Sequence, residues 1–310
     1  MTGIRTIFWK EMADHFGSKR FLVIAFIIVL ASLSSAYGAL GSPELHNFGK
    51  EYLFLSLLST SGGTLPSFLF FVSFLTPLIG IIMGFDAING EKQRGTLSML
   101  VSQPIYRDSI INGKFLAALA VSALMIAGIL ALIAGVSMSK LGIVPNEEEI
   151  ARTLVFYFAT LLYISFWLSM AILFSVLFDK TSTSALASIA LWIFLVFFVY
   201  MVAGILADHL APISQNSSVE EVMRNERLKI TFMRASPAYL LQEISMAVLN
   251  PAVRILTPLT ADRLQGLIPT PLSVGQSVMV VWPQLVVLCA LSIICFGISY
   301  VAFMRKEIRS

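Results

Sequence analysis

The chain has 310 residues, of which 57% are hydrophobic and only 13% are charged, and its formal net charge at pH 7 is +3. A soluble domain usually carries about one-quarter charged residues, so this composition argues against the two soluble domains that the length alone would suggest. The net charge is small and no basic stripe is interleaved with aromatic residues, so nothing indicates a nucleic-acid partner.

Residues 1–20 are predicted to form an amphipathic helix at the membrane interface. Their apolar residues recur at helical spacing, at Ile4, Ile7, Phe8, Met12 and Phe16. The alternative is a cleaved signal sequence, because the small residues Ser34 to Ala36 follow the first apolar run. A start of 20 residues is too long and too regularly patterned for the charged part of a signal sequence, which favours the interfacial helix.

Six stretches contain no Asp, Glu, Lys, Arg or His, and each is long enough to span a membrane. A helix rises about 1.5 Å per residue, so roughly 20 residues cross a hydrocarbon layer of about 30 Å. Backbone amides in lipid must bond within the segment, and these continuous runs lack the alternation of barrel strands. The stretches are Phe21–Gly41, Leu65–Phe85, Phe115–Val136, Thr153–Phe178, Ser184–Ala207 and Ser277–Met304. The sequence therefore predicts an all-α integral membrane protein whose six-helix transmembrane domain comprises residues 21–310.

Basic residues gather in one set of connections, which predicts the orientation of the chain. That set holds Arg5, Lys10, Lys19, Arg20, Lys92, Arg94, Arg107, Lys114, Lys180, Arg305, Lys306 and Arg309. The other short connections hold only Lys50, Lys140 and Arg152, next to the acidic run Glu147–Glu149. Segment 208–276 carries six more basic residues, but long translocated segments are largely exempt from the rule. We therefore expect both termini in the cytoplasm and the chain in the plasma (inner) membrane.

The connection between the second and third spans, Asp86–Lys114, is the most informative polar segment. A charged start from Glu91 to Arg94 leads into an apolar cluster, and Pro104 ends any helix. The cluster consists of Leu97, Met99, Leu100 and Val101. This pattern predicts a short helix with an apolar surface at the inner face of the membrane. Such a surface fits either headgroups and helices of the same chain, or a soluble partner whose displacement would pass into the bundle.

The same connection carries a resemblance to a known family. It resembles the first cytoplasmic connection of ABC-2 type transporter permeases, in particular the NosY-like group, at Gly90-Glu91, Gly95-Thr96-Leu97, Pro104 and Gly113-Lys114. The number of spans, the amphipathic start and the ending Phe303–Arg309 are also similar to that group. The resemblance implies a dimeric six-helix transport domain that is driven by separate ATPase subunits. These subunits would bind ATP and Mg²⁺ and grip the cytoplasmic connections as coupling helices, so no cofactor is expected in this chain.

By position within this resemblance, two segments would contact the ATPase. The first lies between the second and third spans and comprises Glu91, Arg94, Gly95, Thr96, Leu97, Leu100 and Val101. The second is the turn between the fourth and fifth spans, at Asp179 and Lys180, although a tight polar turn needs no partner to explain it.

Two patterns that suggest an enzyme are incomplete. The run from Gly90 to Gly95-Thr96 imitates a phosphate loop but lacks the Lys before the Thr, and no strand precedes it. The pattern Glu147-Glu148-x-x-x-Arg152 matches a motif of intramembrane CAAX-type proteases, which also need His residues on neighbouring spans. The three His residues lie outside the spans, at His15, His46 and His209. We predict no catalytic and no metal-binding residue, and interpret the Glu run as the start of the fourth helix.

Segment 208–276 is predicted to contain external helices. Ser236-Pro237 forms an N-cap followed by proline at the first helical position, which opens a helix that ends at Asn250-Pro251. Val219–Met233 is charged enough to be a solvated helix. These helices either cap the outer mouth of a transport path or seal the ends of the spans.

The spans themselves hold no ionisable residue, although proton- or ion-coupled carriers normally need one at membrane depth. A transporter that is powered from outside the membrane has no such need. The candidate substrate path comprises Ser73, Thr76, Pro77, Ser165 and Ser169. Hydroxyl groups in spans also commonly bond the backbone of their own helix. We predict a permease subunit of an ATP-driven exporter that works with a second permease copy. The alternative is a membrane anchor or assembly protein whose inner helix binds another soluble partner.

Overall fold

The computed structural model describes residues 2–42, 52–61, 66–97, 102–103, 105–142, 144–214, 217–251, 253, 256 and 271–306. These residues form helices and no strand, which confirms the predicted all-α fold. The helices are α1 Thr2–Gly17, α2 Lys19–Leu40, α3 Leu53–Ser59, α4 Phe68–Gly84, α5 Asn89–Gln93, α7 Arg107–Leu141, α8 Glu147–Leu177, α9 Thr181–Ile193, the π-helix η3 Phe194–Phe198, α10 Val199–Leu210, α11 Val219–Met233, α12 Pro237–Leu249 and α14 Val274–Arg305.

Six helical stretches of the described chain are long and apolar enough to cross a membrane. They are Lys19–Leu40, Phe68–Gln93, Arg107–Leu141, Glu147–Leu177, Thr181–Leu210 and Val274–Arg305. Each overlaps one of the six predicted spans, so the number and order of the spans are confirmed. The protein is a multi-pass membrane protein.

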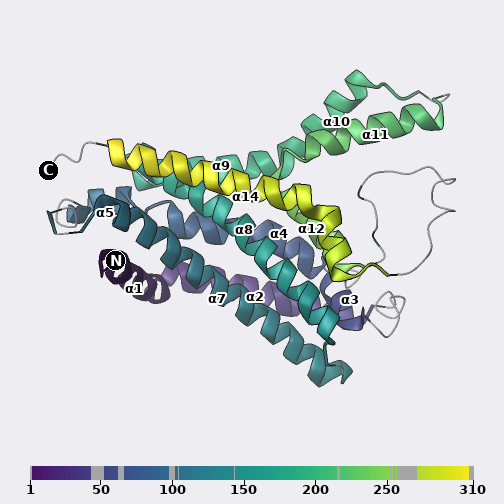
Figure 1. Cartoon of the computed structure of the whole chain (residues 1–310), viewed down its shortest axis with the longest axis horizontal. Helices are drawn as coiled ribbons and strands as arrows, with labels where there is room; N and C mark the ends of the chain where they lie inside the picture. The colour runs from purple at the N-terminus through teal and green to yellow at the C-terminus, as the bar shows by residue number, and fades with distance from the viewer. Residues whose placement is uncertain are drawn as a thin grey trace.

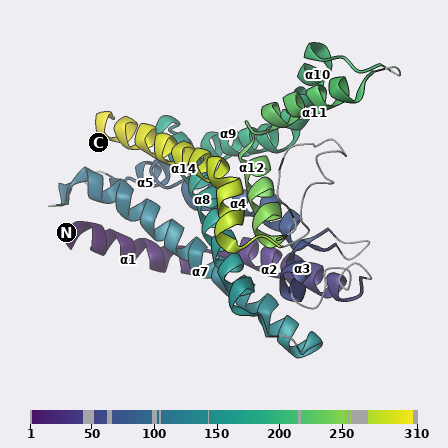
Figure 2. The ribbon, with the colours of Figure 1, turned by 45° about the vertical axis from the view of Figure 1, so that its right-hand side comes forward.

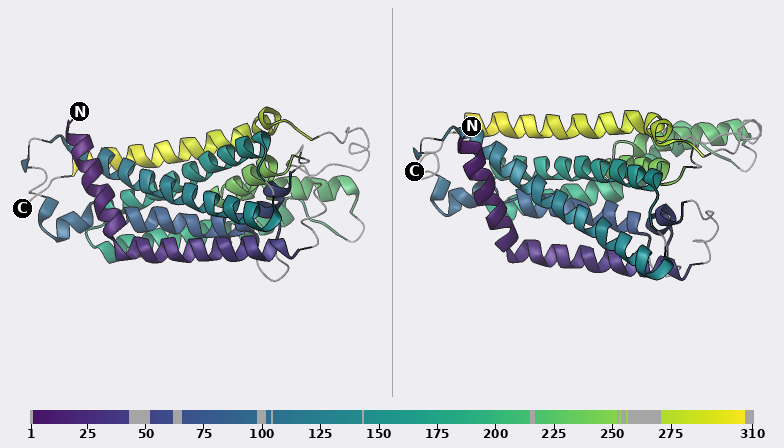
Figure 3. Two further views of the ribbon diagram at one scale, coloured as in Figure 1. Left: turned by 90° about the horizontal axis from the view of Figure 1, so that it is seen from below. Right: turned by 60° about the horizontal axis from the view of Figure 1, so that its bottom comes forward.

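The long helices run side by side in one elongated bundle with α8 at its centre (Figure 1). Helix α8 packs against α4, α7, α12 and α14, and its buried side chains include Phe156, Tyr163 and Trp167. Helix α1 lies steeply across one end of the bundle, next to α5 (Figure 3). We call this end the α1 end and the opposite one, where α3 and α12 lie, the α3 end. The antiparallel pair α10 and α11 projects from the bundle beyond the α3 end (Figure 2).

Two glycines let α4 approach the centre of the bundle unusually closely. A Cβ atom added to Gly80 would lie 2.8 Å from the backbone nitrogen of Leu168 and 2.9 Å from the carbonyl oxygen of Ile164. A Cβ on Gly84 would lie 2.7 Å from the Cβ of Ala171. Glycines four residues apart on one helix face are the usual means of close helix contact in membranes. The two glycines therefore set the distance between α4 and α8.

The proline inside α4 is compensated by a side chain from α8. Pro77 has no backbone N–H, so the carbonyl of Ser73 loses its partner within the helix. The hydroxyl of Tyr163 donates to this carbonyl at 3.0 Å. An irregularity in α4 is thereby fixed against the central helix.

Replacing Gly80 by alanine is expected to destabilise the bundle by about 1–3 kcal/mol, because the new methyl group meets backbone atoms that have no freedom to turn away. Gly128→Ala on α7 is the matched control, since a Cβ there meets no atom within 4 Å. The thermal midpoint of the purified protein in lipid nanodiscs would report the difference. Equal midpoints for the two variants would show that the contact between α4 and α8 is looser than described.

Helix α12 confirms the helix predicted after Ser236-Pro237, but it packs into the bundle. Ten of its 13 residues are buried, and it contacts α4, α8 and α14. Its buried Glu243 accepts three hydrogen bonds from Arg234, at 3.2 Å, 3.0 Å and 2.9 Å, and one from Gln284 of α14 at 2.9 Å. A buried carboxylate needs such partners to remain charged. Glu243 thus connects the turn before α12 to the last span.

Candidate functional site

The structure brings the two segments predicted to contact a partner together at the α1 end. Lys92 of α5 forms an ion pair of 2.7 Å with Asp179, in the turn between α8 and α9. The amide of Gln93 donates to the carbonyl oxygen of Asp179 at 3.3 Å and accepts from the hydroxyl of Thr181 at 3.3 Å. Lys92 and then Lys306 hold the pKa of the exposed Asp179 carboxyl below its ordinary value. The two segments form one surface, which we call the coupling patch. It consists of the exposed residues Lys92, Gln93, Arg94, Gly95, Asp179 and Lys180.

Beneath the coupling patch, α5 is bonded to the end of α8. The hydroxyl of Ser175 accepts from the backbone nitrogens of Ile88 and Asn89, at 2.9 Å and 3.1 Å, and donates to the side-chain oxygen of Asn89 at 3.0 Å. The amide of Asn89 donates to the carbonyl of Phe178 at 3.2 Å. Because these bonds are mostly buried, a displacement of α5 must move the end of α8 with it.

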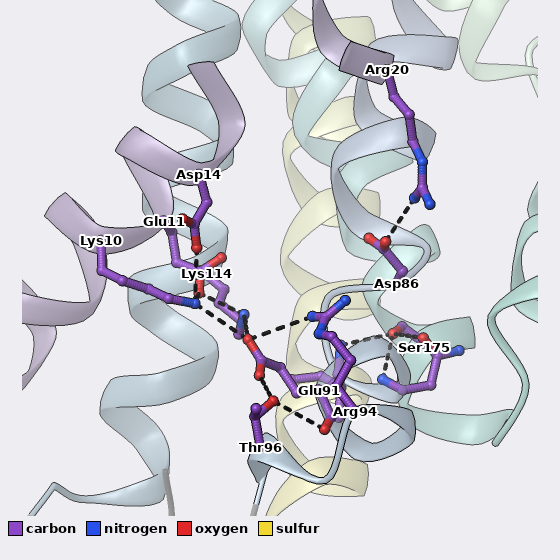
Figure 4. Close-up of polar contacts among 12 residues, drawn as sticks. Lys10, Glu11, Asp14, Arg20, Asp86, Glu91, Arg94, Thr96, Lys114 and Ser175 are labelled. Atoms are coloured by element: carbon purple, nitrogen blue, oxygen red, sulfur yellow. Dashed lines mark hydrogen bonds and ion pairs between the residues drawn. The ribbon is translucent and has the colours of Figure 1, made fainter. Parts of the chain in front are cut away.

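A buried group of charges joins α5 to α1 and α7 (Figure 4). The ammonium of Lys114 on α7 lies 2.7 Å from the carboxylate of Glu11 and 3.3 Å from that of Glu91. Lys10 lies 2.9 Å and 3.3 Å from the same two carboxylates. The hydroxyl of Thr96 donates to the second oxygen of Glu91. Lys10, Glu11, Glu91 and Lys114 form what we call the Lys114 cluster, in which two positive charges balance two negative ones.

The members of the Lys114 cluster on α1 carry their charges at neutral pH. Burial alone would raise the pKa of the Glu11 carboxyl, but the charge and hydrogen bond of Lys114 outweigh it and lower the pKa. Burial opposes the charge of Lys10, yet the hydrogen bond to Glu11 and the neighbouring carboxylates raise its pKa. The nearby His15 is different, because burial lowers its pKa and favours the neutral ring. Ion pairs therefore hold the cluster together, and the neutral His15 contributes no charge to them at neutral pH.

Close packing supports the same position of α1. A Cβ atom added to Gly113 of α7 would lie 2.7 Å from the side chain of Ile7. Arg20, at the start of α2, forms an ion pair of 2.8 Å with Asp86 behind the end of α4. Apolar contact thus seats α1 beside α7, and an ion pair joins the start of α2 to the residues that follow α4.

A cavity lies in the other half of the bundle, towards the α3 end. Its volume is about 730 Å³, and α3, α4, α12 and the stretch from η3 into α10 form its walls. Ser73 lines it, together with Phe74 of the same helix. Among the described residues, the coupling patch and this cavity both have the geometry of functional sites. A further cavity of about 710 Å³ lies at the α1 end, beside the Lys114 cluster, and its lining includes Asp86 and Arg94.

A family model described as "ABC-2 family transporter protein" matches residues 5–308. The chain belongs to the ABC-2 transporter family. It is 28% identical over 203 residues to a protein of Pseudomonas aeruginosa named "Probable ABC transporter permease protein NosY", an alignment that covers 63% of this chain and 68% of that one. A protein of the same name from Stutzerimonas stutzeri is 29% identical over 116 residues, covering 37% and 38%. The predicted family is confirmed, and this ABC-2 permease is a membrane subunit of a transporter whose ATPase is a separate partner.

The predicted coupling residues of the permease fall into two groups. Arg94, Gly95, Asp179 and Lys180 are exposed, whereas the side chains of Glu91 and Leu97 are buried. Gly95 has φ of +71°, a conformation that other residues rarely adopt, so it shapes the end of the patch. Thr96 is half-buried and bonded to Glu91. Leu100 and Val101 lie outside the described residues. A contact through Glu91 or Leu97 stays a prediction, and their burial favours a role in positioning α5.

Of the predicted path residues, only Ser73 lines the described cavity. The hydroxyls of Thr76 and Ser169 donate to backbone carbonyls of their own helices, each at 2.7 Å. Ser165 meets Ser292 of α14 at 3.0 Å, and Pro77 is buried inside α4. The path through these four residues stays a prediction, and here they take part in helix packing.

Within the pattern that resembled a protease motif, Arg152 forms an ion pair of 2.9 Å with Glu148, and Arg152 and the neighbouring Glu149 make helix contacts in the permease. Arg152 is completely buried and donates to the carbonyl of Val248 at 2.8 Å and to the hydroxyl of Ser277 at 3.1 Å. Glu149 caps the start of α8 through Asn146 and accepts from the backbone nitrogen of Phe54 at 2.9 Å. Within the described residues, no group of three His, Cys, Asp or Glu side chains is placed to hold a metal ion.

Proposed function

We propose that this permease is an exporter subunit that is moved by a separate ATPase gripping the coupling patch. The observation that supports this most directly is the meeting of two segments, 86 or more residues apart in sequence, in a single exposed surface. Its exposed groups include Arg94, which also lies 3.8 Å from Glu91 of the Lys114 cluster, and Lys180, and both are accessible to a partner. The partner would bind ATP and Mg²⁺, and hydrolysis would take place there.

The connections below the patch would carry the motion. Ser175 bonds α5 to α8, the central helix of the bundle, and the Lys114 cluster bonds α5 to α1 and α7. Rigid helices transmit displacement over longer distances than loops do. ATP binding would draw two ATPase subunits together and shift the permease from one conformation of its bundle to another. A partner can shift such an equilibrium only if it binds the two conformations with different affinity, so the coupling patch must differ between them. Two permease copies would then rock against each other.

The orientation that we propose has both termini in the cytoplasm and the permease in the plasma (inner) membrane. The basic residues gathered at the α1 end support this orientation. Export is part of this proposal, in which the cavity near the α3 end lies on the side that would face outward. The apolar runs hold no ionisable side chain, so coupling to a proton or ion gradient has no site within them.

The double variant Arg94→Ala/Lys180→Ala tests the patch. We expect the affinity for the cognate ATPase to fall about tenfold, which corresponds to about 1.4 kcal/mol, because exposed Arg and Lys groups would lose their contacts with the partner. Co-purification and ATP turnover of the complex in nanodiscs would measure the loss. Arg224→Ala/Arg227→Ala on α11, where both residues are exposed, is the matched control. Full ATPase binding by the patch variant would overturn the proposed docking surface.

A further inference from the structure

The cavity near the α3 end has the size and the walls of a small-molecule site. Its volume of about 730 Å³ lies within the range of about 300–1,000 Å³ that is common for ligand pockets. A second cavity of about 430 Å³ adjoins it and shares Ser59, Ser67, Leu69, Ser245 and Met246. The walls combine α3 and α4 with the stretch from η3 into α10 and with α12, which come much later in the sequence, so the hollow is a product of the fold.

The chemistry of the walls excludes charged ligands. Phe70, Phe74 and Phe197 provide aromatic surface, and Ser73, Tyr200 and Gln242 provide hydrogen-bonding groups. The lining contains no Asp, Glu, Lys, Arg or His. A phosphate, carboxylate or ammonium group placed here would have no opposite charge beside it, which is costly away from water.

Free hydrogen-bonding groups remain inside the cavity. Tyr200 and the side-chain oxygen of Gln242 lie 3.5 Å apart and bond each other weakly. Within the described part of the chain, neither the hydroxyl of Ser73 nor the amide nitrogen of Gln242 has a hydrogen-bond partner. The hydroxyls of Ser59 and Ser245, in contrast, donate to the carbonyls of Leu55 and Leu241 in their own helices. Ser73 and Gln242 are therefore the groups that a ligand would meet.

The cavity opens sideways, where lipid would surround the bundle. Phe70 and Phe197 are 53% and 54% exposed although they also line the cavity, so they form its rim. Ser73 is the sixth residue of α4, which places the cavity about 9 Å along that helix from its start at the α3 end. A ligand dissolved in that half of the bilayer has direct access.

Two helix irregularities flank the cavity at the same level. The π-helix η3 contributes Val196 and Phe197 to one wall, and π-helical turns inside longer helices are frequent at functional sites. On the facing wall, Pro77 interrupts the hydrogen bonding of α4 at Ser73. Both walls thus carry a departure from regular α-helical hydrogen bonding at the level of the cavity.

We propose that this cavity binds the transported substrate, and that the substrate is an uncharged amphipathic molecule with an apolar, ring-containing body and a hydroxyl, carbonyl or amide group. The molecule enters from the lipid side, stacks against the Phe residues and bonds Ser73 and Gln242. This rests on the proposed transport function. The proposal restricts the transported substrates to molecules without a net charge.

The test uses the full permease alone in nanodiscs, with 1-pyrenemethanol as the neutral probe and 1-pyrenesulfonate as its charged counterpart. Trp192 packs on Phe74 at a ring distance of 5.1 Å, so its fluorescence reports a probe in the cavity once the other three tryptophans, Trp9, Trp167 and Trp282, are replaced by Phe in every variant. We expect saturable quenching by pyrenemethanol above the level in empty nanodiscs. Ser73→Phe fills the cavity and Gln242→Leu removes the amide, and each is expected to weaken binding at least tenfold. Leu124→Phe, on the exposed side of α7, is the matched control.

Three results would overturn the proposal. Equal binding in all variants would show that the probe only dissolves in the lipid. Equally tight binding of pyrenesulfonate would remove the restriction to neutral ligands. Preferential occupation by a pyrene-labelled phospholipid would assign the cavity to membrane lipid. Since binding is measured without the ATPase, its failure is distinct from a failure of the docking surface, which the Arg94→Ala/Lys180→Ala variant tests separately.

Discussion

Replacing Lys114 by methionine is expected to lower the free energy of unfolding of the permease by about 3–5 kcal/mol, because two buried carboxylates lose their buried cation and keep only the exposed Lys10 as a partner. The side chain of Lys114 is only 6% exposed, and Glu11 and Glu91 are 9% and 6% exposed. Methionine is about as long as the aliphatic part of the lysine side chain and keeps its apolar contacts. The decrease in the free energy of unfolding therefore measures the effect of removing the positive charge. Thermal unfolding in nanodiscs would measure it. Binding of the ATPase should weaken as well, since α5 loses its bond to α7.

Lys10→Met is the control for this prediction. Lys10 pairs with the same two carboxylates, but its side chain is 45% exposed, so water and Lys114 continue to solvate them. We expect a change below about 1 kcal/mol. Adding Glu11→Gln and Glu91→Gln to Lys114→Met should restore most of the lost stability, because no unpaired charge then stays buried. A single Lys114→Met variant as stable as Lys10→Met would contradict the role given to the cluster.

The spans were predictable because the bilayer imposes a local rule. About 20 apolar residues in succession suffice to identify each one, and no distant contact is needed. The coupling patch was predictable in part, since Arg94 lies between the second and third spans and Asp179 between the fourth and fifth, the two connections that were expected to contact a partner. That these connections meet depends on the close crossing of α4 and α8. The four-residue spacing of Gly80 and Gly84 indicates a close contact between helices, and this spacing can be read directly from the sequence of the second span.

The Lys114 cluster could not be derived from the sequence in the same way. Lys114 and Glu11 are 103 residues apart, and charge counting treats Lys114 only as one of several basic residues on one side. Helix α12 presents a similar difficulty, because its 13 residues are too few for a span and its charge at Glu243 resembles that of a solvated helix. Its burial results from partners on α8 and α14 that only the fold supplies.

Replacing Arg152 by methionine is expected to lower the free energy of unfolding of the permease by roughly 3–6 kcal/mol. The guanidinium donates to two backbone carbonyls, those of Val248 and Leu272, and each such charged hydrogen bond is worth about 1.5–3 kcal/mol. Val248 lies in the last turn of α12, where carbonyls have no donor within the helix. The positive charge there also suits the negative end of the helix dipole. Arg152 therefore fixes the end of α12 to α8 and, through Ser277, to α14.

The consequence should reach the cavity, because α12 forms one of its walls. Hydrogen exchange of residues 237–249 is expected to rise in Arg152→Met, and saturable binding of pyrenemethanol should fall, while exchange at the α1 end stays unchanged. Arg227→Met on α11 removes an exposed arginine and should change none of these. Lys in place of Arg152 keeps the charge but reaches fewer carbonyls, so an intermediate effect is expected. Unchanged protection of α12 in Arg152→Met would show that apolar packing against α8 and α14 alone holds this wall, and that the buried arginine is dispensable for the shape of the cavity.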